Sequence, residues 1–174
     1  MDAAYALHND SKPHTGVVIN LGETLVYVSS KKQKCMSKSP TKVELIGLTD
    51  NLGLVELFHE FIEFLMMKKI DPLTIYQDCN AVVSLVTKGG GQTRIKHLRA
   101  RVNLGKEMVD ERRVVVKHIC AEDMEADGFS KPYVPVDHKK FAIKLVMRTN
   151  GDNGWALSKV ETKSSTTRVG RSEK

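Results

Sequence analysis

The chain has 174 residues, enough for one domain, and its 41% hydrophobic and 28% charged residues exclude global disorder. No apolar run approaches the ~18 residues of a spanning helix, and the first residues show no secretory signal. Three widely spaced cysteines (Cys35, Cys79 and Cys120) argue against a disulfide framework and a zinc site. We therefore expect an intracellular protein, cytoplasmic or nuclear, without a membrane partner. Its net charge of +6 favours a polyanionic partner without requiring one.

Two β-rich runs begin the predicted fold. Residues 15–20 and 25–28 are mostly β-branched, aliphatic or aromatic, and the intervening residues 21–24 have turn composition. This pattern predicts a β-hairpin. The polar, basic residues 29–39 that follow predict a loop or a fraying strand end.

A long helix is predicted next. Ser39 and Pro40 suit an N-cap and a first helical position, and the helical periodicity continues to about Met67. Its apolar face, predicted to pack on the core, contains Leu54, Phe58, Phe61 and Leu65.

The second half of the domain alternates strands and helices. The pattern predicts a strand over 73–78, a helix over 80–88, a basic helix over 93–113 weakened by Gly105, a strand over 114–119 and a short helix over 123–130. This order predicts an α/β fold with a mixed sheet and helices on its faces.

Three regions are predicted along the chain. Residues 1–133 form the domain, and residues 134–161 form a C-terminal extension with room for one short element at 141–147. Residues 162–174 form a polar, basic tail whose composition favours disorder.

Four carboxylates occupy positions that suggest a metal site. Glu44 falls on the azimuth of Ile62 if the long helix is continuous at ~100° per residue, which places an acid on the apolar stripe. Asp78 ends a buried-looking strand, Asp2 begins the chain's first apolar stretch, and Asp127 lies in the last short helix. Clustered carboxylates bind hard divalent cations. Simpler roles are open: Glu44 could favour the helix dipole, Asp78 could cap the next helix, and Asp2 could be terminal and exposed.

Basic residues of the helix predicted over 93–113 suit a nucleic acid backbone. The candidates are Arg94, Lys96, His97, Arg101 and Lys106. The alternative is a solvated helix surface.

An ordered series of short motifs carries a family resemblance. The matching stretches are Asp2-Ala3-Ala4-Tyr5-Ala6, His14-Thr15-Gly16, residues 29–34, residues 37–45, Tyr76-Gln77-Asp78, Thr93-Arg94-Ile95-Lys96-His97 with Arg101, and residues 126–132. In this order they resemble the ribonuclease H (RNase H) domain that follows the reverse transcriptase in copia-type retrotransposon polyproteins. The resemblance spans about three quarters of the chain.

The resemblance implies an RNase H fold, a mixed sheet of about five strands with flanking helices. It also implies Mg²⁺-dependent hydrolysis of the RNA strand of RNA–DNA hybrids, with two Mg²⁺ ions for which Mn²⁺ could substitute. The residues that match the family's acids are Asp2, Glu44, Asp78 and Asp127. The implied partners are the hybrid and, in an intact element, the reverse transcriptase region of the same polyprotein.

Some positions depart from the family pattern. Cys79 stands in place of Asn, Arg99 in place of Asp, and Lys42 in place of an acidic residue. Only Met1 precedes Asp2, so we expect a first strand truncated at the N-terminus. The alternative function is a catalytically inactive retroelement remnant with at most nonspecific nucleic acid binding. A different metal nuclease or an integrase on a similar fold is a third reading, which the motif order disfavours.

Overall fold

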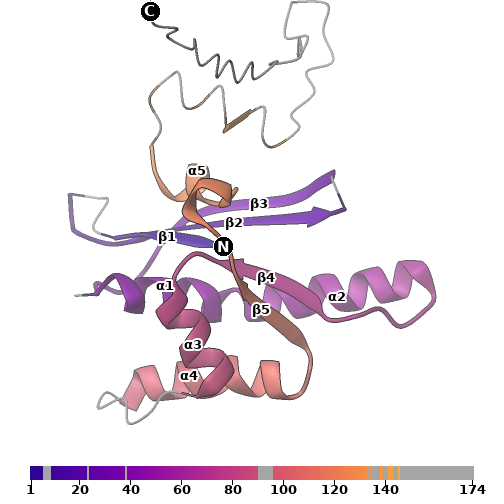
Figure 1. Ribbon diagram of the computed structural model, residues 1–174. Helices are drawn as coiled ribbons and strands as arrows, with labels where there is room; N and C mark the ends of the chain where they lie inside the picture. Colours follow the sequence, from indigo (N-terminus) through magenta and orange to yellow (C-terminus); the bar gives the residue numbers. More distant parts are fainter. Residues whose placement is uncertain are drawn as a thin grey trace, which may run out of the picture.

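In the computed structural model of this chain, the strands lie in the centre and helices lie on both sides of them (Figure 1). The structure describes residues 1–5, 9–22, 24–37, 39–89 and 96–132, with residues 134, 138, 141, 142 and 145, and only the backbone of Lys96 and His97. Its elements are β1 (Asp2–Ala4), β2 (His14–Leu21), β3 (Thr24–Lys32), α1 (Pro40–Asp50), α2 (Leu52–Met66), β4 (Leu73–Gln77), α3 (Asn80–Lys88), α4 (Lys96–Asp110), β5 (Val114–His118), the 3₁₀ turn η1 (Ala121–Asp123) and α5 (Asp127–Ser130).

The strands form two sheets. β1, β2 and β3 make an antiparallel sheet in that order, and β4 and β5 make a parallel pair connected through α3 and α4. The predicted α/β class with about five strands is confirmed, and the arrangement fits an RNase H-like fold. The single mixed sheet is not formed, because β1 has three residues and pairs only with residues 14–16 of β2.

The predicted hairpin is confirmed and is longer than expected. β3 continues to Lys32, so residues 29–32 are in the strand and not in a loop. Buried Gln33 then connects the hairpin to α1, because its side-chain amide donates to Thr15 Oγ1 at 2.9 Å and to the Val43 carbonyl at 3.0 Å. The end of β3 is therefore fixed to the helix that carries Glu44.

The predicted continuous helix over 40–67 is wrong, because it breaks at Asn51. This residue has φ −108° and ψ 1°, and its side-chain amide donates to the Gly47 carbonyl at 2.7 Å. Asparagine competes with the helix ladder through such local bonds. Glu44 on α1 and Ile62 on α2 therefore do not share a helix face, although Glu44 is half-buried as predicted for an acid on the inner side.

The predicted packing of α2 is also only partly correct. Leu52 and Val55 are buried, and Phe58 packs against Tyr27 with ring centroids 5.5 Å apart. Phe61 and Leu65, which were expected in the core, are 53% and 61% exposed because the second half of α2 extends beyond the strands (Figure 1).

A tight helix pair lies under the β4–β5 sheet. The helix predicted over 80–88 is confirmed as α3, and α4 occupies part of the stretch predicted over 93–113. α4 continues through Gly105, and a Cβ there would lie 2.8 Å from Val86 Cγ1, so the glycine allows α4 to approach α3. The hydrophobic core between these helices and the strands includes Leu48, Val82, Val86, Val102, Met108 and Val114.

The last elements close the opposite face. The helix predicted over 123–130 is instead the turn η1 followed by the single-turn helix α5, which packs on β1, β2 and β3. Of the element predicted over 141–147, the structure describes three residues, including buried Leu145, and the tail over 162–174 lies outside the described residues. In the described part of the chain, none of the helices has the length and apolarity needed to cross a bilayer.

Candidate metal centre

Asp2 lies in the middle of the fold. It is 2% exposed because β2 flanks it at Gly16 and because α1 and α5 pack on β1 from opposite sides. Ser130 donates a short hydrogen bond to its Oδ2, and Lys131 Nζ lies 3.9 Å from the same oxygen. Burial raises the pKa of the Asp2 carboxyl, although the Ser130 hydrogen bond acts in the opposite direction.

Glu44 reaches the same point from α1. Its Oε1 accepts the Ala3 backbone N–H at 3.2 Å, and its Oε2 accepts the Gln77 side-chain amide at 2.7 Å. Burial, followed by the negative charge of Asp2, raises the pKa of Glu44 to about 8. This group therefore carries a proton near neutral pH unless a cation lies beside it.

Asp78 completes a group of three acids. It follows the last residue of β4, and one carboxylate oxygen from each of Asp2, Glu44 and Asp78 lies within 4.8 Å of the others. Three separate elements thus bring together oxygen ligands of the type that Mg²⁺ prefers.

Gln77 supports this group from within the core. Its side chain is fully buried, and its amide nitrogen lies 2.7 Å from Glu44 Oε2 and 3.5 Å from Asp78 Oδ1. Its Oε1 has no hydrogen-bond partner among the described residues. The carboxylate oxygens of Asp2, Glu44 and Asp78 are of the donor type that fits a divalent cation at the site.

Asp127 lies nearby but outside this group of three. Its carboxylate pairs with Lys131, one turn later in the chain, and Lys131 also faces Asp2. Burial alone would lower the pKa of the Lys131 ammonium, but the hydrogen bond to Asp127 and the charge of Asp2 raise it. Lys131 therefore supplies a cation on the α5 side of the site.

Gly16 permits α5 to approach the acids. A Cβ at this position would overlap the Ala126 carbonyl oxygen and would lie 2.9 Å from the Ser130 backbone nitrogen. Only glycine allows this close contact between β2 and α5. The contact positions Ser130 and Asp127 beside β1.

The simpler roles considered for the acids do not fit the structure. Asp2 is buried and not exposed. Glu44 lies beyond the first turn of α1, which contains no acidic residue, so it is too far from the helix N-terminus to stabilise the helix dipole. Cys79, and not Asp78, is the N-cap of α3, and no side chain caps that helix.

The predicted nucleic acid contacts are only partly described. Arg94 and the side chains of Lys96 and His97 lie outside the described residues. Arg101 Nη1 is 2.5 Å from Asp50 Oδ1, and Lys106 Nζ is 2.6 Å from Asp110 Oδ2. Both cations already have an acidic partner within the fold, and their role in binding phosphates stays a prediction.

Sequence reasoning did not identify Gln77, Ser130 or Lys131 as parts of the site. The i, i+4 spacing of Asp127 and Lys131 is a signal for their pairing. A glutamine directly before Asp78 at the end of an apolar strand is a second signal, because a buried amide requires partners. The contact of Ser130 with Asp2 joins residues 128 positions apart, and no local pattern indicates it.

Comparisons with known proteins identify distant relatives. The chain is 26% identical over 145 residues to the retrovirus-related Pol polyproteins from transposons RE1 and RE2 of Arabidopsis thaliana, which covers 83% of the chain. It is 25% identical over 138 residues, 79% of the chain, to the corresponding polyprotein from transposon TNT 1-94 of Nicotiana tabacum. The chain spans about a tenth of the length of these curated relatives. No family model matches it, and no solved structure matches it.

Proposed function

We propose that this retrotransposon-related chain is an RNase H domain that hydrolyses the RNA strand of RNA–DNA hybrids. The observation that carries the proposal is the convergence of Asp2, Glu44 and Asp78 from β1, α1 and the end of β4. The distant relatives are Pol polyproteins of transposons, which agrees with a retroelement origin.

The three converging acids would hold Mg²⁺, or Mn²⁺ in its place. Bound metal would supply Lewis acidity that activates water and stabilises the departing 3′ oxygen. Asp127 would be the fourth ligand in a site for two ions. Lys131 Nζ pairs with Asp127 Oδ1, so Asp127 Oδ2 is the oxygen that would join the other acids.

The surrounding residues of the chain would fix the ligands in position. The Ala3 N–H and the Gln77 amide hold one oxygen each of Glu44, and Ser130 holds Asp2 Oδ2. These bonds orient the carboxylates before metal arrives, which is what an effective site requires. The hybrid would be recognised through duplex shape, phosphates and 2′-hydroxyls, without base readout.

The decisive experiment is cleavage of an end-labelled RNA–DNA hybrid in Mg²⁺, with single-stranded RNA and double-stranded DNA as substrate controls. We expect cleavage of the RNA strand of the hybrid only, and its loss in EDTA. Asp78→Asn should abolish cleavage. Asp71→Asn, the same change at an exposed residue near the opposite end of β4, should not.

The alternative, an inactive remnant, predicts a different result. The parent chain would then show at most nonspecific nucleic acid binding and would not cleave the hybrid at any Mg²⁺ or Mn²⁺ concentration. Equal cleavage by the parent and Asp78→Asn would show that the activity arises elsewhere, and would refute the assignment of the site.

A further inference from the structure

The outer face of α2 is apolar along most of the helix. Four large apolar side chains follow the spacing i, i+4, i+7 and i+8, which places them on one side of a helix. They are Leu57, Phe61, Phe64 and Leu65, called the α2 stripe below, and each is more than half exposed. Proteins that stay monomeric in water rarely expose a continuous apolar patch, so the stripe indicates an interaction surface.

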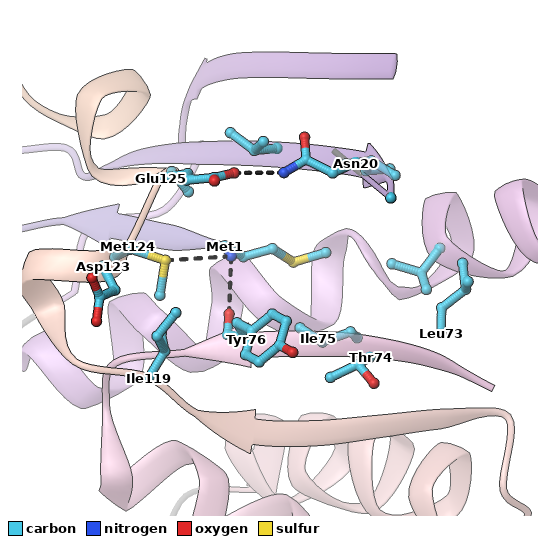
Figure 2. A pocket seen from close by; sticks show the side chains of 15 residues that line it. Met1, Asn20, Leu73, Thr74, Ile75, Tyr76, Ile119, Asp123, Met124 and Glu125 are labelled. Carbon is cyan, nitrogen blue, oxygen red and sulfur yellow. Dashed lines mark hydrogen bonds between the residues drawn. The ribbon is translucent and has the colours of Figure 1, made fainter. Parts of the chain in front are cut away.

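The fold uses the other face of α2. Leu52 and Val55 are buried, and Phe58 packs on Tyr27. Val55 also lines a cavity of about 420 Å³ between β2 and β4 (Figure 2). The second half of α2 extends beyond the strands (Figure 1). The stripe therefore lies on the side of the helix that the described part of the fold leaves exposed.

The charges beside the stripe are placed symmetrically about Phe64. Exposed Glu60 lies four residues before Phe64, and exposed Lys68 lies four residues after it. Met67 ends the helix in a left-handed conformation, and the Lys68 N–H donates to the Glu63 carbonyl at 3.3 Å, which holds Lys68 at the last turn. At ~1.5 Å per residue, the two charges lie at similar distances from Phe64 along the helix axis, in opposite directions.

We propose that the α2 stripe binds the α2 stripe of a second copy of this chain, with the two helices antiparallel. A twofold axis at Phe64 would bring the two Phe64 rings together, and it would place Glu60 of each copy opposite Lys68 of the other. Such an interface uses the same patch on both copies. The proposal does not depend on the proposed nuclease function.

The charges select this occupant and this orientation. An antiparallel pair joins Glu60 to Lys68 twice, whereas a parallel pair would oppose Glu60 to Glu60 and Lys68 to Lys68. A lipid surface would cover the apolar side chains but would offer no arrangement that is matched to both charges. A single helix pair buries less than the ~1,200 Å² at the lower limit of standard interfaces, so we expect a weak dimer with a dissociation constant in the micromolar range.

Sedimentation velocity of the full chain, from micromolar to near-millimolar protein, tests the proposal. A reductant is needed because Cys35 and Cys120 are exposed and could cross-link two copies. We expect a reversible equilibrium between monomer and dimer. Phe64→Gln should weaken dimerisation at least about tenfold, because a large apolar residue at the centre of an interface carries much of the binding energy. Leu104→Gln, the same type of change at an exposed apolar residue of α4, should not.

Charge reversal tests the antiparallel register. Glu60→Lys and Lys68→Glu should each weaken self-association several-fold, because each variant alone places like charges opposite each other. The variant with both changes should dimerise as the parent does. An equimolar mixture of the two single variants should form a heterodimer, because opposite charges then meet again. Glu107→Lys, the same change at an exposed position of α4, should leave dimerisation unchanged.

Three results would each overturn the proposal. The first is a parent chain that stays monomeric at near-millimolar concentration, which would leave the stripe to a different partner. The second is an equal effect of Phe64→Gln and Leu104→Gln on dimerisation. The third is a mixture of Glu60→Lys and Lys68→Glu that forms no heterodimer. The substituted residues are all exposed, so the circular dichroism spectra of the variants should match the parent, which separates loss of the dimer from loss of the fold.

Discussion

Replacement of Glu44 by Gln should change how stability depends on pH. The pKa of Glu44 is raised from 4.5 to about 8, with burial as the main cause. A carboxyl with a raised pKa binds its proton more tightly in the folded state than in the unfolded state. Its protonation therefore favours folding at low pH, and stability falls as pH rises from about 4.5 to about 8.

The size of this effect follows from the shift of the pKa. At ~1.36 kcal/mol per unit, the shift corresponds to an upper limit of roughly 5 kcal/mol. Water that enters the half-buried site reduces this penalty. We therefore expect Glu44→Gln to be more stable than the parent by about 2–4 kcal/mol at pH 8.5, and close to it at pH 5. This gain corresponds to a rise of roughly 5–15 °C in Tm.

The assay is thermal unfolding of both proteins from pH 5 to 9 in EDTA. Burial lowers the pKa of the Met1 amine, which acts on stability with the opposite sign, but this amine is present in both proteins. Glu60→Gln, the same change at an exposed position of α2, should follow the parent. Millimolar Mg²⁺ should remove most of the parent's loss of stability at high pH. Parallel profiles for the parent and Glu44→Gln would refute the reasoning.

Three further predictions concern neighbouring positions. Asp78→Asn should leave stability in EDTA unchanged or raised, since it relieves carboxylate repulsion, while the rise of Tm with Mg²⁺ is lost; a preserved Mg²⁺ response would exclude Asp78 as a ligand. Gln77→Leu removes the amide that donates to Glu44, so we expect Mg²⁺ to stabilise this variant less than the parent at pH 7. We also expect its free energy of unfolding, measured by denaturant titration, to be lower by about 1–3 kcal/mol. Gly105→Ala should lower the free energy of unfolding by about 1–3 kcal/mol, because the added methyl group overpacks against Val86. Adding Val86→Ala should restore part of this lost stability. If Gly105→Ala instead raises the free energy of unfolding by ~1 kcal/mol, helix propensity outweighs the contact.

The sequence predicts local elements well where one periodicity dominates. The boundaries of α3 and β5 agree with the pattern of Val residues, and the hairpin is correct apart from its length. The break at Asn51 was missed because it depends on a side-chain bond to Gly47 that competes with an otherwise helical pattern. The exposure of Phe61 could not be predicted, because periodicity identifies an apolar face but not what covers it.

The candidate site shows the same division between local and tertiary information. In the sequence each acid is indicated separately, Asp78 by its place at a strand end and Glu44 by its expected place on an inner helix face. Their convergence depends on how β1, α1 and β4 pack. Gln77 and Ser130, which are far apart in the chain, each donate a hydrogen bond to one carboxylate oxygen and so determine which oxygens have no such bond from them.

The electrostatics of the three acids are those expected of the proposed cation site. Burial raises the pKa values of both Asp2 and Glu44, so the metal-free fold holds carboxyls that resist ionisation side by side. Such an arrangement weakens a fold near neutral pH unless a positive charge compensates it. Lys131 pairs with Asp127, lies 3.9 Å from Asp2 Oδ2, and is also attracted by the charge of Asp78. The neutral amide of Gln77 lies 2.7 Å from Glu44 Oε2 and 3.5 Å from Asp78 Oδ1, and in the proposed site a divalent cation would add to the charge of Lys131 in offsetting the repulsion among the acids.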